Sequence, residues 1–329
     1  MIKKVTCSVN RGGIEESQHA INCVVVNQEN KILFQSGDIS KNYCLRSTLK
    51  PFQCAASLEQ GTDIKYNLSP KEIAITCASH HGEKEHVSTA QSILKKINLT
   101  EDSLECGFHF PLNKENKTKL YSKQVNHSNI YNNCSGKHSG LLAMIKNLGL
   151  TTKGYINHDH PIHKYINSYI EDIAEKKPKT LAIDGCSLPT PYFNLLTLAN
   201  MYIKLIPAPN GSSLSKVFSA MTKHPQMVSG SQGFDTFFMK TFKGKAISKG
   251  GAEGMQAIAM KTKKGTPVAL VLKVSDGSHR GNYISSIKIL EYLNIINTKE
   301  ATKLLSFIVS DQYNLNKLKI GELVCNILD

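Results

Sequence analysis

Arg46-Ser47-Thr48-Leu49-Lys50-Pro51-Phe52-Gln53 is the stretch around which the rest of this chain is organised. Apolar residues follow it with helical spacing and stop at Gly61, so the sequence predicts that Ser47 lies in the first turn of a helix of roughly a dozen residues. Pro51 suits a helix start, because the amide that proline lacks is not needed there. A serine and a lysine three positions apart meet on one face of a helical turn, so a hydroxyl and an amine come within reach of each other.

The chemistry of this pair depends on its surroundings. A serine hydroxyl becomes a good nucleophile only when a base removes its proton, and a lysine acts as that base only if burial or a nearby cation lowers its pKa. Ser47 and Lys50 supply the two groups but not that environment. By itself, the spacing favours a plain helix start in which Ser47 is a cap and Lys50 is solvated, so the functional reading needs support from other motifs.

Length and composition predict one soluble domain. The 329 residues contain no linker rich in proline, glycine or serine, so we expect a single domain, 1–329, with two subregions. A hydrophobic content of 40% supports a substantial core. The longest apolar runs, such as Val268–Leu272, are too short to span a bilayer, which disfavours a membrane partner. The N-terminus turns polar after two lysines, so no signal-peptide core is present and we expect a cytoplasmic protein.

Cysteine content and charge exclude further classes. The nine cysteines lack close pairing, which favours reduced thiols over a disulfide framework. The formal charge of +14 would suit a nucleic-acid-binding protein. However, the lysines are scattered and no basic stripe with interleaved aromatic residues occurs, so we do not expect nucleic-acid binding.

Strand patterns occur at both ends of the chain and helical patterns in the middle. The segments that read as strands are 21–26, 31–35, 255–260 and 267–274, and those that read as helices include 83–96, 161–175 and 192–205. This order predicts an α/β (α+β) fold in which one antiparallel sheet is built from both chain ends and a helical subregion lies between them.

A second serine follows a predicted helix. Ser69 and Pro70 have the composition of a helix start, and the helix should end at Ala78-Ser79-His80-His81-Gly82-Glu83. Ser79 lies between a helix end and a glycine, a position typical of loops that carry chemistry, although a plain turn is the commoner explanation. The adjacent histidines have no further ligand at zinc spacing, so a histidine-based metal site is not expected.

Two cysteines lie in polar loops that contain glycine. The segment 132–140, with Cys134 and Lys137, should be a loop that leads into a helix over 141–148, and the Walker spacing that nucleotide binding needs is absent. Cys186 lies in a second loop, 183–191, close to Asp184. Two thiolates and a third ligand can hold zinc, but without a Cys-x-x-Cys the spacing leaves this question open.

The last third of the chain contains glycines and a lysine inside a strand pattern. Lys249 to Gly254 precedes the strands, and Lys273 interrupts the otherwise apolar segment 267–274. Such a lysine must reach solvent or a partner in a polar site, because an unpaired buried ammonium is unfavourable.

Taken in order, these motifs resemble the bacterial type II L-asparaginase family of the rhizobial inducible type, and the resemblance covers nearly the whole chain. The motifs are Arg11-Gly12-Gly13 with Glu16-Ser17 and His19, Arg46 to Gln53, Ser79-His80 with Gly82-Glu83 and His86, Cys134-Ser135-Gly136-Lys137-His138, Asp184-Gly185-Cys186, His224-Pro225, Gly251-Ala252-Glu253-Gly254, and Lys273 with Asp276-Gly277.

The resemblance implies a fold similar to serine β-lactamases and glutaminases, a homodimer, and hydrolysis of L-asparagine to aspartate and ammonia. It implies two Ser–Lys pairs, Ser47 with Lys50 and Ser79 with a strand lysine placed at Lys273, with Lys249, Lys261 and Lys263 as alternatives nearby. The implied substrate-binding positions are Arg46, His80, Asp184, Gly251 and Glu253. The implied zinc ligands are Cys134, Lys137 and Cys186.

Other function classes remain open. A glutaminase would use the same chemistry on a longer side chain. A β-lactamase or transpeptidase also uses Ser-x-x-Lys, but this chain has no downstream Ser-Asp-Asn or Lys-Thr-Gly and no export signal. A zinc-stabilised binding module without catalysis is the remaining alternative.

Overall fold

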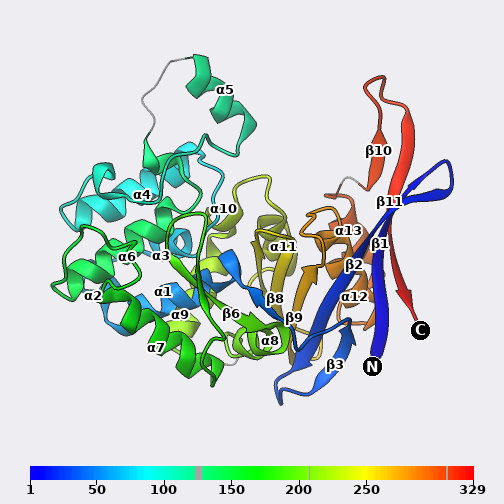
Figure 1. The fold of residues 1–329 in the computed structure, drawn as a ribbon, viewed down its shortest axis with the longest axis horizontal. Helices are drawn as coiled ribbons and strands as arrows, with labels where there is room; N and C mark the ends of the chain where they lie inside the picture. Colours follow the sequence, from blue (N-terminus) through cyan, green and yellow to red (C-terminus); the bar gives the residue numbers. More distant parts are fainter. Residues whose placement is uncertain (123–127, 207, 309) are drawn as a thin grey trace. The chain divides into compact units, whose positions relative to one another are not determined.

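The computed structural model describes residues 1–122, 128–206, 208–308 and 310–329. The chain forms two compact units (Figure 1). The sheet unit comprises Met1–Thr48, Phe193–Pro207 and Phe237–Asp329, and the helical unit comprises Leu49–Tyr192 and Ala208–Thr236. In sequence, the helical unit therefore lies between the N-terminal and the C-terminal strands.

An eight-stranded sheet dominates the sheet unit, with the strand order β10-β11-β1-β3-β2-β9-β8-β7. Its strands are β1 (Ile2–Arg11), β2 (Ile14–Asn27), β3 (Ile32–Ser36), β7 (Ala246–Gly251), β8 (Met255–Lys261), β9 (Pro267–Val274), β10 (Asp311–Tyr313) and β11 (Lys319–Leu328). Figure 1 shows β1 and β11, from opposite ends of the chain, side by side. The prediction of a sheet built from both chain ends is confirmed.

One strand pairing differs from the antiparallel sheet that the sequence predicts. Strands β1 and β3 pair in parallel, with Ile2 opposite Gln35. The chain reverses direction after β1 and again after β2, so β3 runs in the same direction as β1. The long strand β2 pairs antiparallel with β1, β3 and β9 in turn, which makes the sheet mixed.

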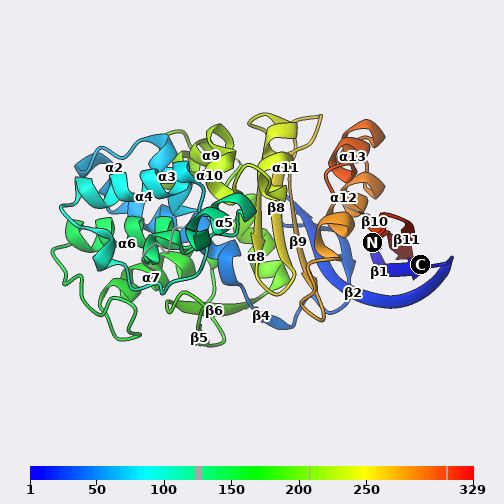
Figure 2. The same ribbon diagram turned by 90° about the horizontal axis from the view of Figure 1, so that it is seen from above.

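Helices cover both faces of this sheet. Figure 2 shows α8 (Leu195–Ile203) on one face, and α12 (Asn282–Tyr292) with α13 (Thr298–Leu305) on the other. All residues of β9 are consequently buried, which explains why its sequence is apolar apart from Lys273 instead of alternating. The unit also contains the short strand β4 (Asn42–Cys44) and the first three residues of a 3-10 turn, Arg46–Leu49.

The helical unit is built from short helices. They are α1 (Lys50–Glu59), α2 (Thr62–Lys65), α3 (Pro70–Thr76), α4 (Lys84–Lys96), α5 (Lys114–Ser122), α6 (Ser135–Asn147), α7 (Ile162–Ala174), α9 (Ser213–Lys223) and α10 (Pro225–Ser229). Strands β5 (Leu181–Ile183) and β6 (Pro189–Asn194) form a hairpin, and α11 spans Phe234–Phe242. Within the described ranges, no helix is both long and apolar enough to cross a membrane.

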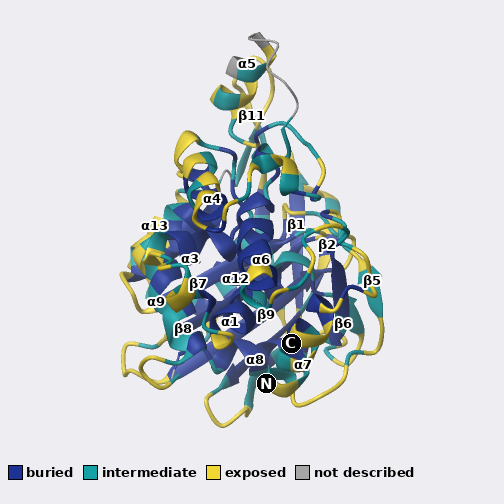
Figure 3. Ribbon diagram, turned by 90° about the vertical axis from the view of Figure 1, so that its left-hand side faces the viewer, coloured by how far each residue is buried: buried dark blue, intermediate teal, exposed yellow. Residues whose placement is uncertain are grey.

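Helix α6 lies at the centre of the helical unit. Its residues from Ser135 to Ile145 are all buried, and it packs against α1, α3 and α4. Figure 3 colours most of α1 and α3 as buried. The sequence predicted a loop over 132–140, but the helix already begins at Ser135. The glycines of this segment, Gly136 and Gly140, suggested a loop. In the structure they lie against α3, where a larger residue would not fit, so they serve helix packing.

Two predicted helix starts are close to those observed. Ser47 lies in the 3-10 turn that leads directly into α1, and Pro51 occupies one of the first two positions of that helix. Ser69 caps α3: its Oγ accepts a hydrogen bond from the Glu72 amide at 3.3 Å, and the Glu72 carboxylate accepts one from the Ser69 amide at 2.7 Å. This capping box fixes the helix that precedes the Ser79 loop.

The Glu72 carboxylate is a buried anion with several donors. It accepts hydrogen bonds from Lys96 Nζ at 2.7 Å and from Ser92 Oγ at 2.8 Å, in addition to those from Ser69. Burial by itself would raise the pKa of Glu72, but these donors hold it below its ordinary value.

We expect Glu72→Gln to lower the free energy of unfolding by about 1–2 kcal/mol near neutral pH, because the variant loses charged hydrogen bonds. Since the pKa of Glu72 is lower in the folded than in the unfolded chain, its carboxylate stabilises the fold above the unfolded pKa of about 4.3. That stabilisation is lost as the pH falls through the folded pKa. The difference between parent and variant in urea unfolding should therefore shrink as the solution is acidified.

Glu85→Gln is the matched control, because Glu85 forms an exposed ion pair with Lys71. Its effect should stay below about 1 kcal/mol at every pH. Equal effects of the two substitutions near neutral pH would contradict the role given to Glu72.

Candidate active site

Lys50 is the centre of a buried polar cluster in the helical unit. It is the first residue of α1 and is only 1% exposed. Its Nζ donates hydrogen bonds to Ala78 O at 2.5 Å, to Ser79 Oγ at 3.0 Å and to Cys134 Sγ at 3.1 Å. Because a buried ammonium is tolerated only with partners, the end of α3 and the start of α6 have to meet at this amine.

The loop after α3 presents the Ser79 hydroxyl to Lys50. Ser79 is half-buried, and its amide donates to Val228 O at 2.9 Å. The next amide, that of His80, donates to Asn133 O at 3.0 Å. The backbone on both sides of the hydroxyl is therefore fixed to neighbouring segments.

His80 is fully buried and fastens this loop to the start of α6. The Gly82 amide donates to His80 Nδ1 at 3.1 Å, so the ring proton is on Nε2, which donates to Ser135 Oγ at 2.8 Å. Burial, with the neighbouring His86 and Lys50, holds the pKa of His80 well below its ordinary value. The ring is thus neutral, and both of its nitrogens have partners inside the protein.

Cys134, Lys137 and Cys186 come together beside Lys50. Both cysteines are buried, and their side chains share a hydrogen bond. Lys137 Nζ donates to Cys186 Sγ at 2.8 Å. The cluster therefore contains two sulfurs and two amines, and Cys134 Sγ lies within hydrogen-bond distance of both Cys186 and Lys50.

The protonation of this cluster follows from these contacts. The hydrogen bond from Cys134 lowers the pKa of Cys186 far below its ordinary value in spite of burial, and Lys137 lowers it further. The same hydrogen bond, with burial, raises the pKa of Cys134. Burial would lower the pKa of Lys137, but Cys186, Cys134 and Asp184 together raise it. Near neutral pH the arrangement is therefore a Cys186 thiolate, a Cys134 thiol and a Lys137 ammonium.

Asp184 lies next to this thiolate, in the turn between β5 and β6. Its Oδ1 accepts a hydrogen bond from the Gly185 amide at 2.8 Å, and its Oδ2 lies 3.9 Å from Cys186 Sγ. The turn is closed by a hydrogen bond from the Asp184 amide to Leu188 O at 2.9 Å. The acid and the thiol are therefore presented by one short, rigid turn.

Sequence reasoning missed the side chain that holds Cys134 in place. Asn132 Oδ1 accepts a hydrogen bond from the Cys134 amide at 2.8 Å, and Asn132 Nδ2 donates to the carbonyl oxygens of Cys106 and Gly107, each at 2.9 Å. An asparagine three positions before the first residue of a helix was the available signal, since such residues commonly bond nearby amides.

A buried histidine and tyrosine support the other side of the cluster. The Glu105 amide donates to Tyr155 OH at 2.9 Å, and Tyr155 OH lies 2.7 Å from His138 Nδ1. Burial lowers the pKa of His138, although the nearby Cys186 opposes this. His138 stood in a recognised motif, but nothing in the sequence pointed to Tyr155.

Two glycines of α6 set the distance between α6 and α3. A Cβ atom at Gly136 would lie 2.5 Å from Ile75 O, and one at Gly140 would lie 2.5 Å from Thr76 Cγ2. Both separations are shorter than a carbon atom permits. The absence of side chains at these two positions therefore allows Cys134 and Lys137 to approach the Ser79 loop.

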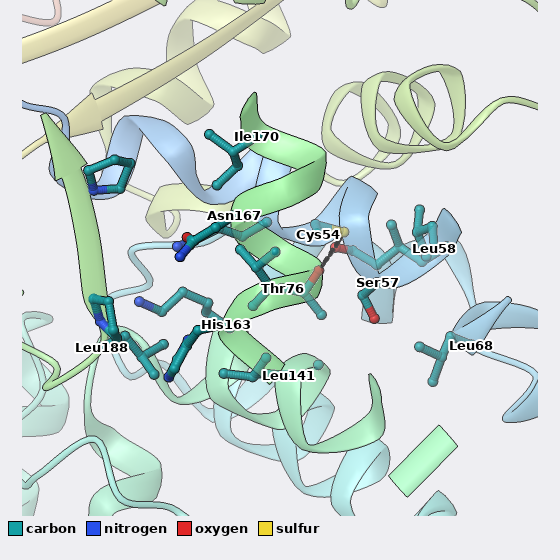
Figure 4. Close-up of a pocket in the computed structure, with 17 residues that line it drawn as sticks. Cys54, Ser57, Leu58, Leu68, Thr76, Leu141, His163, Asn167, Ile170 and Leu188 are labelled. Carbon is teal, nitrogen blue, oxygen red and sulfur yellow. Dashed lines mark hydrogen bonds between the residues drawn. The ribbon is translucent and has the colours of Figure 1, made fainter. Parts of the chain in front are cut away.

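A small cavity lies beside Lys137, between α1, α3, α6 and α7 (Figure 4). Its volume is about 30 Å³, and most of its wall is apolar, with Leu141 and Ile170 among the residues that line it. Thr76 Oγ1 donates to Cys54 Sγ at 2.8 Å on one side. The cavity has room for little more than one water molecule, so it is not a substrate pocket.

The donors at Cys134, Lys137 and Cys186 fit a zinc ion. In the part of the chain that the structure describes, no group of three or more histidine, cysteine, aspartate or glutamate side chains could hold a metal. This set differs because its third donor is an amine. Two sulfurs and a nitrogen that lie within hydrogen-bond contact match the ligand preference of zinc. Metal binding would have to displace protons from Lys137 and Cys134, since only their deprotonated forms are ligands.

The remaining site residues lie in the sheet unit. Ser47 is half-buried, and Arg46 has a φ of +51°, a backbone conformation that non-glycine residues rarely adopt and that often marks functional sites. Gly251 backs onto this segment: a Cβ atom there would lie 3.2 Å from Thr48 Cγ2 and 3.5 Å from Leu45 O. The glycine motif and the segment that carries Ser47 are therefore neighbours.

Lys273 is buried near the end of β9. Its Nζ donates to Val274 O at 2.5 Å. Burial lowers the pKa of Lys273, while Glu253 and Asp276 oppose that effect. The alternative lysine, Lys249 on β7, is 1% exposed and its Nζ donates to Gly250 O at 2.6 Å. Both lysines are buried, so burial does not tell which of them is the partner of Ser79.

The structure thus gathers the predicted site residues into two sets. The helical unit holds Lys50, Ser79, His80, Cys134, Lys137, Asp184 and Cys186, and the sheet unit holds Arg46, Ser47, Gly251, Glu253 and Lys273. Lys50, which the sequence pairs with Ser47, donates to Ser79 within the helical unit. The pairing of Ser47 with Lys50 and that of Ser79 with Lys273 remain predictions.

Comparison with known proteins gave a family match over almost the entire chain. The model of the L-asparaginase II family matches residues 7–325. No curated protein matches the chain. Solved structures to which the chain is similar include β-lactamases.

Three of these structures illustrate the level of similarity. A β-lactamase from Chitinophaga pinensis has 11% identity and a TM-score of 0.39, with 86% of this chain and 89% of that chain covered. The TLA-3 extended-spectrum β-lactamase has 13% identity and a TM-score of 0.43, with 88% and 93% covered. A class A β-lactamase from Bacteroides cellulosilyticus has 10% identity and a TM-score of 0.42, with 90% and 94% covered.

We expect Gly136→Ala to lower the free energy of unfolding by about 1–3 kcal/mol, because the added methyl group forces α6 away from α3. Lys146→Ala, at an exposed position of the same helix, is the control and should change stability by no more than about 0.5 kcal/mol. Urea unfolding measures both. A Gly136→Ala protein as stable as the parent would show that the two helices do not depend on this close approach.

Proposed function

We propose that this chain, which belongs to the L-asparaginase II family, is an amidohydrolase that converts L-asparagine to L-aspartate and ammonia. The observation that carries the proposal is the 3.0 Å hydrogen bond between Lys50 Nζ and Ser79 Oγ within a buried cluster. A hydroxyl in contact with an amine is the arrangement that serine–lysine hydrolases need, since the amine can take the hydroxyl proton once it is neutral.

Charged side chains of both signs suit an amino-acid substrate, which carries a carboxylate and an ammonium group. We assign the carboxylate of the substrate to Lys137 and Arg46, and its ammonium group to Asp184 and Glu253. In a buried site such charges act strongly, because little water screens them.

In the proposed reaction, Ser47 Oγ attacks the side-chain amide carbon of asparagine while a neutral Lys50 accepts the hydroxyl proton. The tetrahedral intermediate collapses to an ester on Ser47, and the amide nitrogen takes up a proton relayed by Ser79 and leaves as ammonia. Water then cleaves the ester to release aspartate and restore Ser47. Ser47 precedes Lys50 by one helical turn, the spacing that this proton transfer requires.

A second assignment of the nucleophile has a specific observation in its favour. The Lys50 amine is in hydrogen-bond contact with Ser79 Oγ, so Ser79 has a base in place. In this version Ser79 carries the ester, and Ser47 relays the proton to the leaving ammonia. The two versions predict esters on different peptides.

The strand lysine completes the proposed machinery. We assign Lys273 to Ser79, as a second amine that tunes the charge of the site and exchanges protons with that hydroxyl. Lys249 is the alternative, since it is also buried and lies on the neighbouring part of the sheet. His80 and Gly251 contribute by fixing the backbone on either side of the catalytic segments.

We propose that zinc binds at Cys134, Lys137 and Cys186. When bound, the ion supplies a positive charge that orients a substrate oxygen. The chain's own residues do the remaining work: Asn132 fixes the amide of Cys134, and the turn at Asp184 presents Cys186. Retention of partial activity without zinc is our expectation, because the proposed proton transfers use only serines and lysines.

We further propose a homodimer, which rests on the family resemblance. Two rival activities use the same groups. A glutaminase would release ammonia from glutamine, and a β-lactamase-like hydrolase would release none from either amide. A zinc-stabilised module without catalysis would release none from any substrate. An ammonia assay with both amino acids therefore separates the asparaginase and the glutaminase from each other and from the two readings that release no ammonia.

We expect Ser47→Ala and Lys50→Met each to reduce the kcat for asparagine by at least about a thousandfold, because each removes one partner of the first proton transfer. Ammonia release measures the rate, and circular dichroism checks the fold. Ser88→Ala, an exposed serine on α4, is the control and should keep full activity.

Mass spectrometry of acid-quenched enzyme then locates the ester. An ester on the Ser47 peptide supports the assignment above, whereas an ester on the Ser79 peptide with an active Ser47→Ala protein would transfer the role to Ser79. Lys273→Met and Lys249→Met, assayed in the same way, identify the strand lysine by which of them loses activity.

We expect protein purified without chelator to contain one zinc per chain, and Cys134→Ala and Cys186→Ala to lose it, because each removes a soft ligand. Metal analysis measures this content. Cys54→Ala, a buried cysteine outside the cluster, is the matched control and should retain the metal. A zinc content far below one per chain in the parent, unchanged in all three variants, would remove the metal site.

A further inference from the structure

Two cysteines at opposite ends of the sequence face each other across neighbouring strands of the sheet unit. Cys7 on β1 is directly opposite Cys325 on β11 in the antiparallel register. Neighbouring pairs on both sides, Ser8 with Val324 and Thr6 with Asn326, keep the same register, so no bulge disturbs the alignment here. Both thiols are free in this structure.

Backbone hydrogen bonds identify the kind of pair that the two cysteines form. The Val5 amide donates to Ser36 Oγ at 2.9 Å, on the side of β1 away from β11. Amide directions alternate along a strand, so the amide of Cys7, two residues later, points the same way. The Leu323 amide donates to Ser310 O at 2.8 Å, and the amide of Cys325 likewise points away from β1.

Cys7 and Cys325 therefore form a non-hydrogen-bonded pair. In such a pair the Cα atoms lie about 4.5 Å apart and the side chains approach more closely than in the hydrogen-bonded kind. A disulfide needs a Cα separation of roughly 4.4–6.8 Å and a Cβ separation near 4 Å. The register thus brings the two cysteines to the lower end of the separation that a disulfide spans.

Both side chains point to the face of the sheet that α12 covers. A Cβ atom at Gly281, just before α12, would lie 3.4 Å from Cys7 Cβ. Ser285, in the first turns of the same helix, lies beside the Cys325 side chain. Cys7 is fully buried, whereas Cys325 is half-buried. A small oxidant can therefore reach the pair through Cys325.

We propose that Cys7 and Cys325 are a site of reversible oxidation, at which a peroxide converts the two thiols to a disulfide that joins the first and the last long strand. Cys325 attacks the peroxide as a thiolate, takes one oxygen and becomes a sulfenic acid, and one water is released. The Cys7 sulfur then attacks the Cys325 sulfur and expels the oxygen as a second water. Two electrons pass from the two sulfurs to the peroxide, and the two thiol protons leave in the water molecules.

The order of the two steps follows from the surroundings of the thiols. Burial raises the pKa of Cys325 to about 11, although Ser285 and Lys288 oppose this, and burial with Cys325 nearby raises the pKa of Cys7 to about 12. Cys325 is thus the more readily ionised and the more accessible of the two. The bond closes a loop of nearly the whole chain, the case in which a cross-link restricts the unfolded chain most.

The test treats the full chain with hydrogen peroxide, blocks the remaining thiols under denaturing conditions and maps the peptides by mass spectrometry. We expect a peptide in which Cys7 is linked to Cys325, which dithiothreitol cleaves, and a rise in melting temperature of about 5 °C or more. Blocked, unlinked Cys7 and Cys325 after oxidation, or a link from Cys7 to Cys23, would overturn the proposal.

Two variants make the melting measurement specific. Cys325→Ala should lose both the linked peptide and the rise in melting temperature, and its half-buried position makes the substitution tolerable to the fold. Cys44→Ala, a half-buried cysteine of the same unit on β4, should keep both. A peroxide-induced rise that persists in Cys325→Ala would come from another cysteine pair and would also overturn the proposal.

Discussion

The buried amine of Lys50 is the constraint on which the helical unit depends. An amine that is 1% exposed must be fully supplied with acceptors, and here these come from Ala78, Ser79 and Cys134. The three acceptors lie after α3 and at the start of α6, so α1, α3 and α6 have to converge on one point. Gly136 makes this convergence sterically possible, because a side chain there would collide with Ile75 O.

The meeting of α1, α3 and α6 also brings the reactive side chains of the candidate site together. Once α6 begins beside Lys50, Cys134 and Lys137 lie on its first turn, and the turn between β5 and β6 brings Cys186 to them. A thiol, a thiolate and two amines then share one buried space and shift each other's pKa values. Burying charged groups of this kind costs free energy, so a functional role explains the cluster better than a contribution to stability does.

The corresponding constraint in the sheet unit is that strands from both chain ends pair within one sheet. Strands β1 and β11 pair along their length, so the first and last strands support each other near one edge of the sheet. This pairing is formed by residues that are as far apart in sequence as the chain allows, and its loop-closure entropy is correspondingly large. The Cys7 and Cys325 pair lies in the middle of this contact, where a covalent link would have the greatest effect.

The sequence by itself determined the local elements and the candidate residues. Ser69 before Pro70 was enough to place α3, apolar runs were enough to place the second half of β2 together with β8 and β9, and the order of the motifs pointed to the family. These features depend on residues close together in the chain. Only the tertiary structure decided that α6 begins at Ser135 and that Lys50 contacts Ser79, because Gly136 and Lys50 respond to partners far away in sequence. Tyr155 left no trace in the local pattern for the same reason: its hydroxyl matters through His138 and Glu105, which only the fold brings to it.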